Sequence, residues 1–212
     1  MIKYWGMTED NDGDDIHKDL PPSSPTSDLL TPQGSIKVLD NSINFYADIS
    51  NPTCAELNRI LRELEIRMQH AKITMHDPEF DPKIHLRISS YGGDVFSALA
   101  TVDVMRSMKT KVYTYVEGAA ASAATLISIA GAKRYIGKNS FMLIHQLSSV
   151  CAGTFERLED EQENNRRLMQ SIKSLYKQYT KIPMKELDNI LKRDIWFDAD
   201  TCLKYGLVDG II

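Results

Sequence analysis

Residues 111–125 read KVYTYVEGAAASAAT and place one serine, Ser122, between a strand pattern and a helix pattern. Residues 111–116 are rich in β-forming types, whereas the residues from Gly118 onward carry almost no side chain. Small neighbours allow a sharp turn and let a substrate carbonyl approach the hydroxyl, as a nucleophile at a strand-to-helix junction requires. The segment by itself fits equally well a small-residue face of a helix in which Ser122 is only filler.

A second strand-and-turn pattern precedes this stretch. Residues 84–88 (IHLRI) are strand-like, residues 89–93 (SSYGG) are turn-like, and a helical pattern covers residues 94–108. The resulting order is strand, glycine turn, helix, strand, small-residue turn and helix, which predicts a mainly parallel sheet covered by helices. We therefore expect an α/β fold, extended by a further strand at residues 141–144 that ends at His145.

The beginning of the chain has a different composition from the rest. Residues 1–33 are acidic and proline-rich, which predicts a flexible N-terminal segment, with a docking arm as the alternative. We expect the folded domain to span residues 34–212 and to open with two strands, 35–39 and 43–47. The pattern Thr53-Cys54-Ala55-Glu56 predicts the capped start of the helix that follows.

Residues 154–180 form a long helical pattern with one apolar stripe. The stripe consists of Phe155, Leu158, Met169, Ile172, Tyr176 and Tyr179. The remaining positions are heavily charged, so the helix is amphipathic and longer than a compact domain requires. We expect the stripe to contact another subunit, with packing on the helix's own domain as the alternative.

Composition excludes several classes of function. The formal net charge of −4 and the absence of a basic stripe argue against a nucleic-acid partner. The 3 cysteines form no CxxC pair, which indicates neither a zinc site nor a disulfide framework, and we expect no metal and no cofactor. The longest run of low charge is shorter than the about 20 apolar residues of a membrane span. We therefore expect a cytoplasmic protein without a membrane partner.

A serine nucleophile needs a base, an acid and an oxyanion site, and the chain offers candidates for each. His145 ends an apolar strand, where parallel-sheet proteins place their sites. Gly92-Gly93 follows a strand and opens a helix, so its backbone N–H groups can face a developing oxyanion. The acid remains open, since the C-terminal region holds four candidate aspartates: Asp188, Asp194, Asp198 and Asp200.

Taken together and in this order, these motifs resemble the Clp protease proteolytic subunit family of serine peptidases. The matching segments are residues 88–93 (ISSYGG), 118–122 (GAAAS), 142–146 (MLIHQ), 193–194 (RD) and 205–209 (YGLVD). The resemblance covers about residues 43–212. It implies that Ser122 is the nucleophile, His145 the general base and Asp194 the orienting acid. It also implies an oxyanion hole formed by the backbone N–H groups of Gly93 and Ala123.

The resemblance implies a fold and an assembly as well. The family fold is a crotonase-like spiral of ββα units with a projecting handle helix, which falls here at about residues 147–180. Family members stack two heptameric rings and enclose their active sites in a chamber that an AAA+ unfoldase feeds. The expected function is thus a serine endopeptidase that cleaves peptides or unfolded proteins inside an oligomeric chamber.

The chain departs from the family pattern at several positions. Tyr91 and Leu147 stand where the family usually has proline, and the acidic start does not look like the family's axial loop. These departures indicate a divergent member, with a phage-encoded protease that processes capsid or scaffold proteins as the alternative. Other classes are a crotonase-type acyl-CoA enzyme, a silent ring subunit, and a Ser–Lys peptidase that uses Lys133 or Lys138. The joint presence of Ser122, His145 and Asp194 argues against all three.

Overall fold

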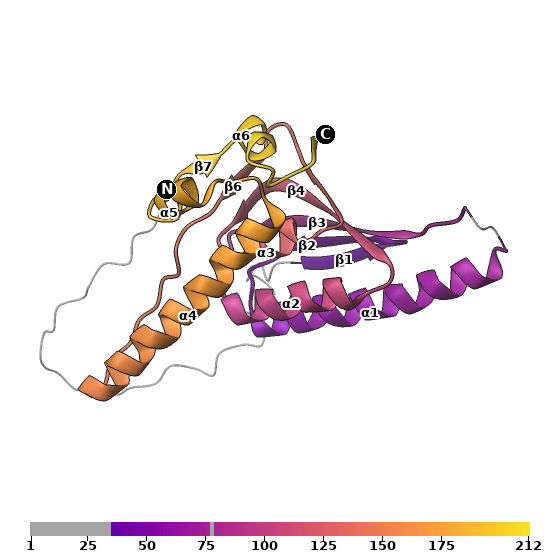
Figure 1. Cartoon of the computed structure of the whole chain (residues 1–212). Coiled ribbons are helices and arrows are strands. Elements are labelled where there is room, and N and C mark those ends of the chain that lie inside the picture. The colour runs from indigo at the N-terminus through magenta and orange to yellow at the C-terminus, as the bar shows by residue number, and fades with distance from the viewer. Residues whose placement is uncertain (1–34, 77–78) are drawn as a thin grey trace, which may run out of the picture. The chain divides into compact units, whose positions relative to one another are not determined.

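The computed structural model describes residues 35–76 and 79–212, which form a mixed α/β arrangement (Figure 1). The elements in chain order are β1 (Ser35–Leu39), β2 (Ser42–Tyr46), α1 (Asn51–Thr74), β3 (Lys83–Ser90), α2 (Val95–Ser107), β4 (Lys111–Ala121), α3 (Ala123–Ile129), β5 (Lys133–Ile136), β6 (Phe141–Leu143), α4 (Phe155–Tyr179), α5 (Met184–Ile190), β7 (Trp196–Phe197), α6 (Ala199–Lys204) and β8 (Gly210–Ile211). The segment predicted to be flexible, residues 1–33, lies outside the described residues.

The strands form one sheet in the order β1-β2-β3-β4-β5-β8, with β6 beside β4 and β7 beside β6. Strands β2, β3, β4, β5 and β8 are paired in parallel, and β6 also runs parallel to β4. Only β1 and β7, among the described strands, pair antiparallel with their neighbours. The prediction of a mainly parallel α/β sheet is therefore confirmed.

The two faces of the sheet differ in what covers them. Buried and partly exposed side chains alternate along β3 and β4, as expected for strands with one face in the core. Helices α1, α2 and α3 pack on one another and on β3 and β4, and they cover the buried face (Figure 1). The opposite face, here called the open face, carries a stack of Tyr115 on Tyr135 with ring centroids 5.1 Å apart. His85 joins it through a hydrogen bond of 2.8 Å between Nδ1 and the Tyr115 hydroxyl.

Helix α1 starts earlier than its sequence pattern suggests. The predicted capping box at Thr53–Glu56 is wrong, because Ser50 is the N-cap and the helix begins at Asn51. Thr53 is the third residue of the helix, and its hydroxyl accepts a hydrogen bond of 3.0 Å from the Ser50 N–H. Pro52 fits the first turn because the N–H that it lacks has no intrahelical partner there.

Helix α4 is attached to the sheet domain mainly through its C-terminal part. Ile172 and Tyr176 are its buried residues, and the helix packs there on α3. Near the N-terminus of α4 the apolar side chains are exposed to solvent: Phe155 is 70% and Leu158 is 44% exposed. The apolar stripe is therefore divided between a buried and an exposed section.

Two further observations concern residues 35–76 and 79–212 as a whole. They include no helix that is both long and apolar enough to cross a membrane. They also include no cluster of three or more His, Cys, Asp or Glu side chains that could hold a metal ion. The cysteines are free thiols, of which Cys54 and Cys202 are buried.

Arg134 fastens the end of α4 and the C-terminal strand to β5. Its guanidinium forms an ion pair with Asp209 and donates a hydrogen bond of 2.9 Å to the Gly206 carbonyl. It also donates to the carbonyl of Tyr179, the last residue of α4. Burial alone would raise the pKa of Asp209, but the hydrogen bonds and charge of Arg134 outweigh it and hold that pKa below its usual value.

We expect Asp209→Asn to lower the free energy of unfolding at pH 7 by about 1.5–3 kcal/mol, the range for a hydrogen bond to a charged partner. A lowered pKa in the folded state stabilises the protein above the unfolded carboxylate value of about 4, and this contribution is lost as the pH falls through the folded value. The difference between wild type and variant should therefore shrink on acidification. Urea unfolding followed by tryptophan fluorescence, at neutral and acidic pH, measures it.

Asp81→Asn is the matched control, because Asp81 pairs with Lys111 while both side chains are about half exposed. Such an exposed ion pair contributes less than about 1 kcal/mol. Equal effects of the two substitutions, or a pH-independent effect at Asp209, would contradict the assigned role of the Arg134–Asp209 pair.

Candidate active site

Ser122 occupies a strained turn between β4 and α3. Strand β4 ends at Ala121 and helix α3 begins at Ala123, so the serine is the single residue between them. Its backbone angles are φ 53° and ψ −126°, a region that costs a residue with a side chain about 1–3 kcal/mol. A hydrogen bond of 2.8 Å from the Ser122 N–H to the Leu143 carbonyl ties the turn to β6. The predicted strand-to-helix junction is thus present.

Strand pairing places His145 opposite Asp194. Strands β6 and β7 are antiparallel, with Leu143 paired to Trp196, and the same register carried two residues further brings His145 against Asp194. The His145 Nδ1 atom lies 3.3 Å from an Asp194 carboxylate oxygen. A backbone hydrogen bond of 2.7 Å from Gln146 to Leu191 holds the two segments together beyond this point. Asp194 can therefore orient the imidazole of His145.

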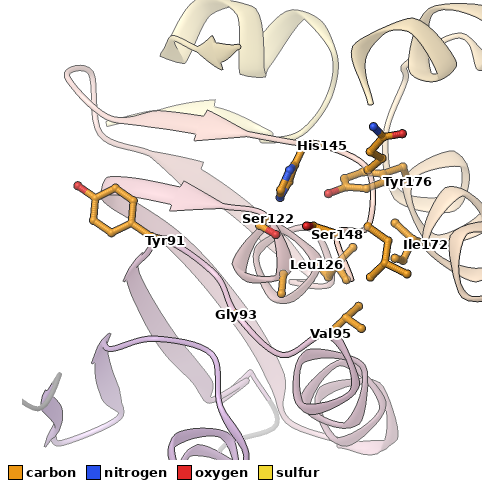
Figure 2. Close-up of a pocket in the computed structure, with 12 residues that line it drawn as sticks. Tyr91, Gly93, Val95, Ser122, Leu126, His145, Ser148, Ile172 and Tyr176 are labelled. Carbon is orange, nitrogen blue, oxygen red and sulfur yellow. The ribbon is translucent and has the colours of Figure 1, made fainter. Parts of the chain in front are cut away.

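Ser122 and His145 line a common pocket at the carboxyl ends of β4 and β6. The pocket has a volume of about 240 Å³ and is here called the helix-side pocket. Its lining residues are Tyr91, Gly93, Val95, Ser122, Ala123, Leu126, His145, Gln146, Leu147, Ser148, Ile172 and Tyr176. Figure 2 shows the His145 ring directed toward Ser122, whereas Val95 and Ile172 lie on the far side of the pocket. The serine thus has a histidine on one side and an apolar cavity on the other.

The glycine pair is held against the serine turn. A Cβ atom on Gly92 would lie 2.7 Å from the Ala121 carbonyl oxygen and 2.8 Å from the Ser122 Cβ. A Cβ atom on Gly93 would lie only 2.1 Å from the Ile49 carbonyl oxygen. Both residues also have positive φ angles, 98° and 141°. Only glycine satisfies both the close approach and the backbone conformation at these positions.

Two backbone N–H groups at the pocket, those of Gly93 and Ala123, have no acceptor among residues 35–76 and 79–212. Ile49 binds the residues on both sides of Gly93, since its N–H donates to the Gly92 carbonyl and its carbonyl accepts from the Asp94 N–H. In such a parallel bridge the N–H of Gly93 itself points away from Ile49, and Gly93 lines the helix-side pocket. Ala123 lines the same pocket as the first residue of α3, where an N–H has no intrahelical partner. A carbonyl oxygen placed between the two groups would accept from both.

The buried hydroxyl groups of Thr125 and Tyr176 support the serine turn through hydrogen bonds. The Thr125 hydroxyl donates to the Ser122 carbonyl at 2.5 Å and lies 2.5 Å from the Tyr176 hydroxyl. Because the Thr125 proton is used in the bond to the Ser122 carbonyl, the Tyr176 hydroxyl is the donor between the two side chains, and burial raises the pKa of its phenol. Helix α4 is in this way hydrogen-bonded to the nucleophile turn. Nothing in the sequence pattern of Thr125 or Tyr176 predicted this contact.

The other candidate residues have different surroundings. Asp188 pairs with Lys173 at 2.7 Å, and Asp198 caps α6 by accepting a hydrogen bond of 2.9 Å from Thr201. The exposed Asp200 lies in the first turn of α6. Lys133 and Lys138 do not line the helix-side pocket, nor do any of the described histidines apart from His145. Of the four aspartates considered, Asp194 is the one that contacts His145.

Comparison with known proteins identifies the family of the chain. The family model described as Clp protease matches residues 56–212. An ATP-dependent Clp protease proteolytic subunit of Deinococcus radiodurans is 32% identical over 62% of this chain and 66% of its own length. Subunit 6 of the chloroplast enzyme of Arabidopsis thaliana is 28% identical over 92% of this chain and 70% of its own length. Subunit 2 of Treponema pallidum is 34% identical over 61% and 66%. The chain thus matches about two thirds of the length of these relatives.

Proposed function

The chain belongs to the Clp protease family, and we propose that it is a serine endopeptidase that works through Ser122, His145 and Asp194. One observation carries the proposal: the β6–β7 register sets His145 against Asp194 at 3.3 Å, and His145 also lines the pocket that contains the strained Ser122. A serine with an adjacent histidine and an orienting carboxylate is the arrangement that acyl transfer requires.

In the proposed reaction, His145 Nε2 takes the proton of the Ser122 hydroxyl as Oγ bonds to the substrate carbonyl carbon. The negative oxygen of the tetrahedral intermediate accepts hydrogen bonds from the Gly93 and Ala123 N–H groups. His145 then donates the proton to the leaving amine as the C–N bond breaks, which leaves an acyl ester on Ser122. A water molecule then attacks the acyl ester in the same way, with His145 again as the base. The ester bond to Ser122 breaks and the carboxylic acid product is released. Asp194 holds the imidazole and stabilises its charged form throughout.

Ser122 and His145 share no hydrogen bond among the described residues, although their side chains face one another (Figure 2). Contacts of this kind are often long in free enzymes and tighten when substrate is bound. We propose that the extended backbone of a bound peptide closes this gap. The substrate is accordingly an unfolded or flexible peptide segment.

The proposed assembly is a set of stacked rings with an AAA+ unfoldase as the ATP-consuming partner. The relatives from Deinococcus radiodurans and Treponema pallidum are named ATP-dependent proteolytic subunits, which supports a multisubunit enzyme. The exposed apolar side chains Phe155 and Leu158 of α4 supply a surface for a subunit contact. A cytoplasmic location fits the free thiols, since disulfides are rare in reducing compartments.

A second candidate function is the processing of a phage structural protein by the same chemistry. The observation in its favour is that the described part of the chain opens with the antiparallel β1–β2 hairpin, which does not resemble the axial loop and first helix that the family is expected to carry at its start. Both candidates share the site chemistry, so a single active-site experiment tests them together.

The proposal is tested by treating the purified chain with a serine-directed phosphonate and mapping the modified residue by mass spectrometry. We expect one label, on Ser122, together with loss of hydrolysis of a fluorogenic peptide. Native mass measurement of the same sample reports the assembly. Labelling of another serine, or peptide hydrolysis that persists after full labelling, would refute the assignment.

Gly93→Ala should lower kcat by about 10²–10³-fold, the cost of losing an oxyanion-hole donor. The added Cβ would sit 2.1 Å from the Ile49 carbonyl oxygen, so the bridge between Ile49 and Gly93 must open and the donor must move. Steady-state hydrolysis of a fluorogenic peptide measures the loss. Gly153→Ala is the control, because its Cβ would meet only the flexible Arg157 side chain. A wild-type kcat in Gly93→Ala would exclude this glycine from the oxyanion site.

A further inference from the structure

A second hollow lies beside the helix-side pocket, on the open face of the sheet. It has a volume of about 550 Å³ and is here called the open-face pocket. Gly118 and Ala119 of β4 form its floor, and Phe141 and Trp196 stand at its side. Because Gly118 and Ala119 have little or no side chain, the space beside the Phe141 and Trp196 rings stays unfilled. The catalytic assignment above gives this pocket no role.

Strand register explains why its aromatic residues gather at this point. Ala119 is paired with Phe141, and Leu143, two residues beyond Phe141 on the same strand face, is paired with Trp196. Trp196 lies 41% exposed and meets the exposed Tyr91 ring edge-on, with centroids 6.2 Å apart. No charged side chain lines the open-face pocket within the described part of the chain.

Tyr91 lines both pockets and so marks the place where they adjoin. The helix-side pocket lies toward α2, α3 and α4, as its lining residues Val95, Leu126 and Ile172 show. The open-face pocket lies across the strand ends, on the other face of the sheet. Tyr91 is the residue that the two linings share, and its ring is directed away from the other lining residues of the helix-side pocket in Figure 2.

Successive side chains of an extended peptide point in opposite directions. The helix-side pocket contains Ser122 and the two oxyanion donors, so it receives the side chain of the residue whose carbonyl is attacked. The next residue, on the leaving-amine side of the scissile bond, must direct its side chain the opposite way. We propose that the open-face pocket binds this side chain and selects large apolar or aromatic residues on the carboxyl side of the cleaved bond.

The chemistry of the lining agrees with this occupant. Tyr91 and Trp196 present the edge-to-face geometry that a further aromatic ring can join, and Phe141 adds apolar surface. An acidic or basic side chain would lose water there without gaining a charged partner. The inference rests on the proposed peptidase function, because it needs an acyl-enzyme on Ser122.

Transfer of the acyl group to an added amine tests only the residue on the leaving-amine side of the scissile bond. A blocked peptide thiobenzyl ester acylates Ser122, and an amino-acid amide added at about pH 8 then competes with water for the acyl group. The α-amine bonds to the acyl carbon as the Ser122 ester bond breaks, and its proton passes through His145 to Ser122 Oγ. Liquid chromatography with mass detection gives the ratio of transfer to hydrolysis. We expect phenylalanine amide to exceed glycine amide about tenfold, and aspartic acid diamide to resemble glycine amide.

Two variants locate the selectivity. Trp196→Ala should reduce the preference to about twofold by removing one wall of the pocket, and Ala119→Leu should reduce it by filling the floor. Trp196→Phe retains an aromatic wall and should keep most of the preference. Each value is a ratio within one enzyme sample, so partial loss of folded protein does not affect it.

A wild-type preference below about twofold would overturn the inference, as would wild-type selectivity in both Trp196→Ala and Ala119→Leu. Transfer to aspartic acid diamide as efficient as transfer to phenylalanine amide would overturn the apolar specificity. Failure of the proposed function is a distinct result, since no acyl-Ser122 would then appear in the mass spectrum and the ester would not turn over. Normal ester hydrolysis without discrimination refutes only the assignment of the open-face pocket.

Discussion

Ser122→Ala should lower kcat/KM for a short fluorogenic peptide by at least about 10⁴-fold, because the proposed acyl-enzyme forms on the Ser122 hydroxyl. Ser122 is the residue between β4 and α3, and His145 faces it across the helix-side pocket. Alanine keeps the small size that the turn requires, so the fold and assembly should persist. Initial rates with a fluorogenic peptide, together with native mass measurement, test both parts of this expectation.

Ser128→Ala is the matched control for this variant. Ser128 belongs to the same helix, α3, and its buried hydroxyl has no hydrogen-bond partner among the described residues. Its removal should therefore leave kcat/KM within about twofold of wild type. Turnover by Ser122→Ala at a rate close to that of Ser128→Ala would rule out Ser122 as the nucleophile.

Asp194→Asn should lower kcat by about 10³–10⁴-fold while leaving KM little changed. An asparagine amide group opposite Nδ1 can donate as well as accept, so it no longer enforces the tautomer in which Nε2 is free to take the serine proton. It also removes the negative charge that stabilises the imidazolium formed during the reaction. The measurement is kcat and KM for the same peptide, with circular dichroism as a check on folding.

Asp200→Asn provides the comparison, since Asp200 is an exposed aspartate six residues further along the chain that has no contact with His145. It should hydrolyse the peptide at nearly the wild-type rate. A similar loss of kcat in both variants would mean that the rate depends on the overall negative charge of this region. The His145–Asp194 contact would then not be what orients the base.

Much of the fold could be predicted from local patterns. The predicted helix at residues 94–108 corresponds to α2 (Val95–Ser107), and the pattern at 154–180 corresponds to α4 (Phe155–Tyr179). These elements carry long periodic patterns, which are the most informative local signal. Strands β5, β7 and β8 were not predicted, because each has only two to four residues and is defined by its neighbours in the sheet; β6 is equally short but could be predicted from its apolar run.

The candidate site likewise contains residues that local sequence patterns predict and contacts that they do not predict. Ser122 and the Gly92–Gly93 turn stand out in the sequence because small residues are required where the chain turns and approaches itself. The physics of the sequence could not choose Asp194 among four aspartates, since the contact with His145 arises from the pairing of β6 with β7. The link from Tyr176 to Thr125 was equally hidden, because it joins residues far apart in the chain.

The pairing of β6 with β7 has a consequence for how this enzyme family can diverge. The proposed base and acid are set by a short antiparallel ladder, and α4 and α5 lie between them in the chain. Insertions and deletions in the exposed N-terminal part of α4 therefore leave the spacing of His145 and Asp194 unchanged as long as Leu143 still pairs with Trp196. Evolution can lengthen or shorten that exposed part, which is the proposed subunit contact, without disturbing the proposed proton-transfer residues.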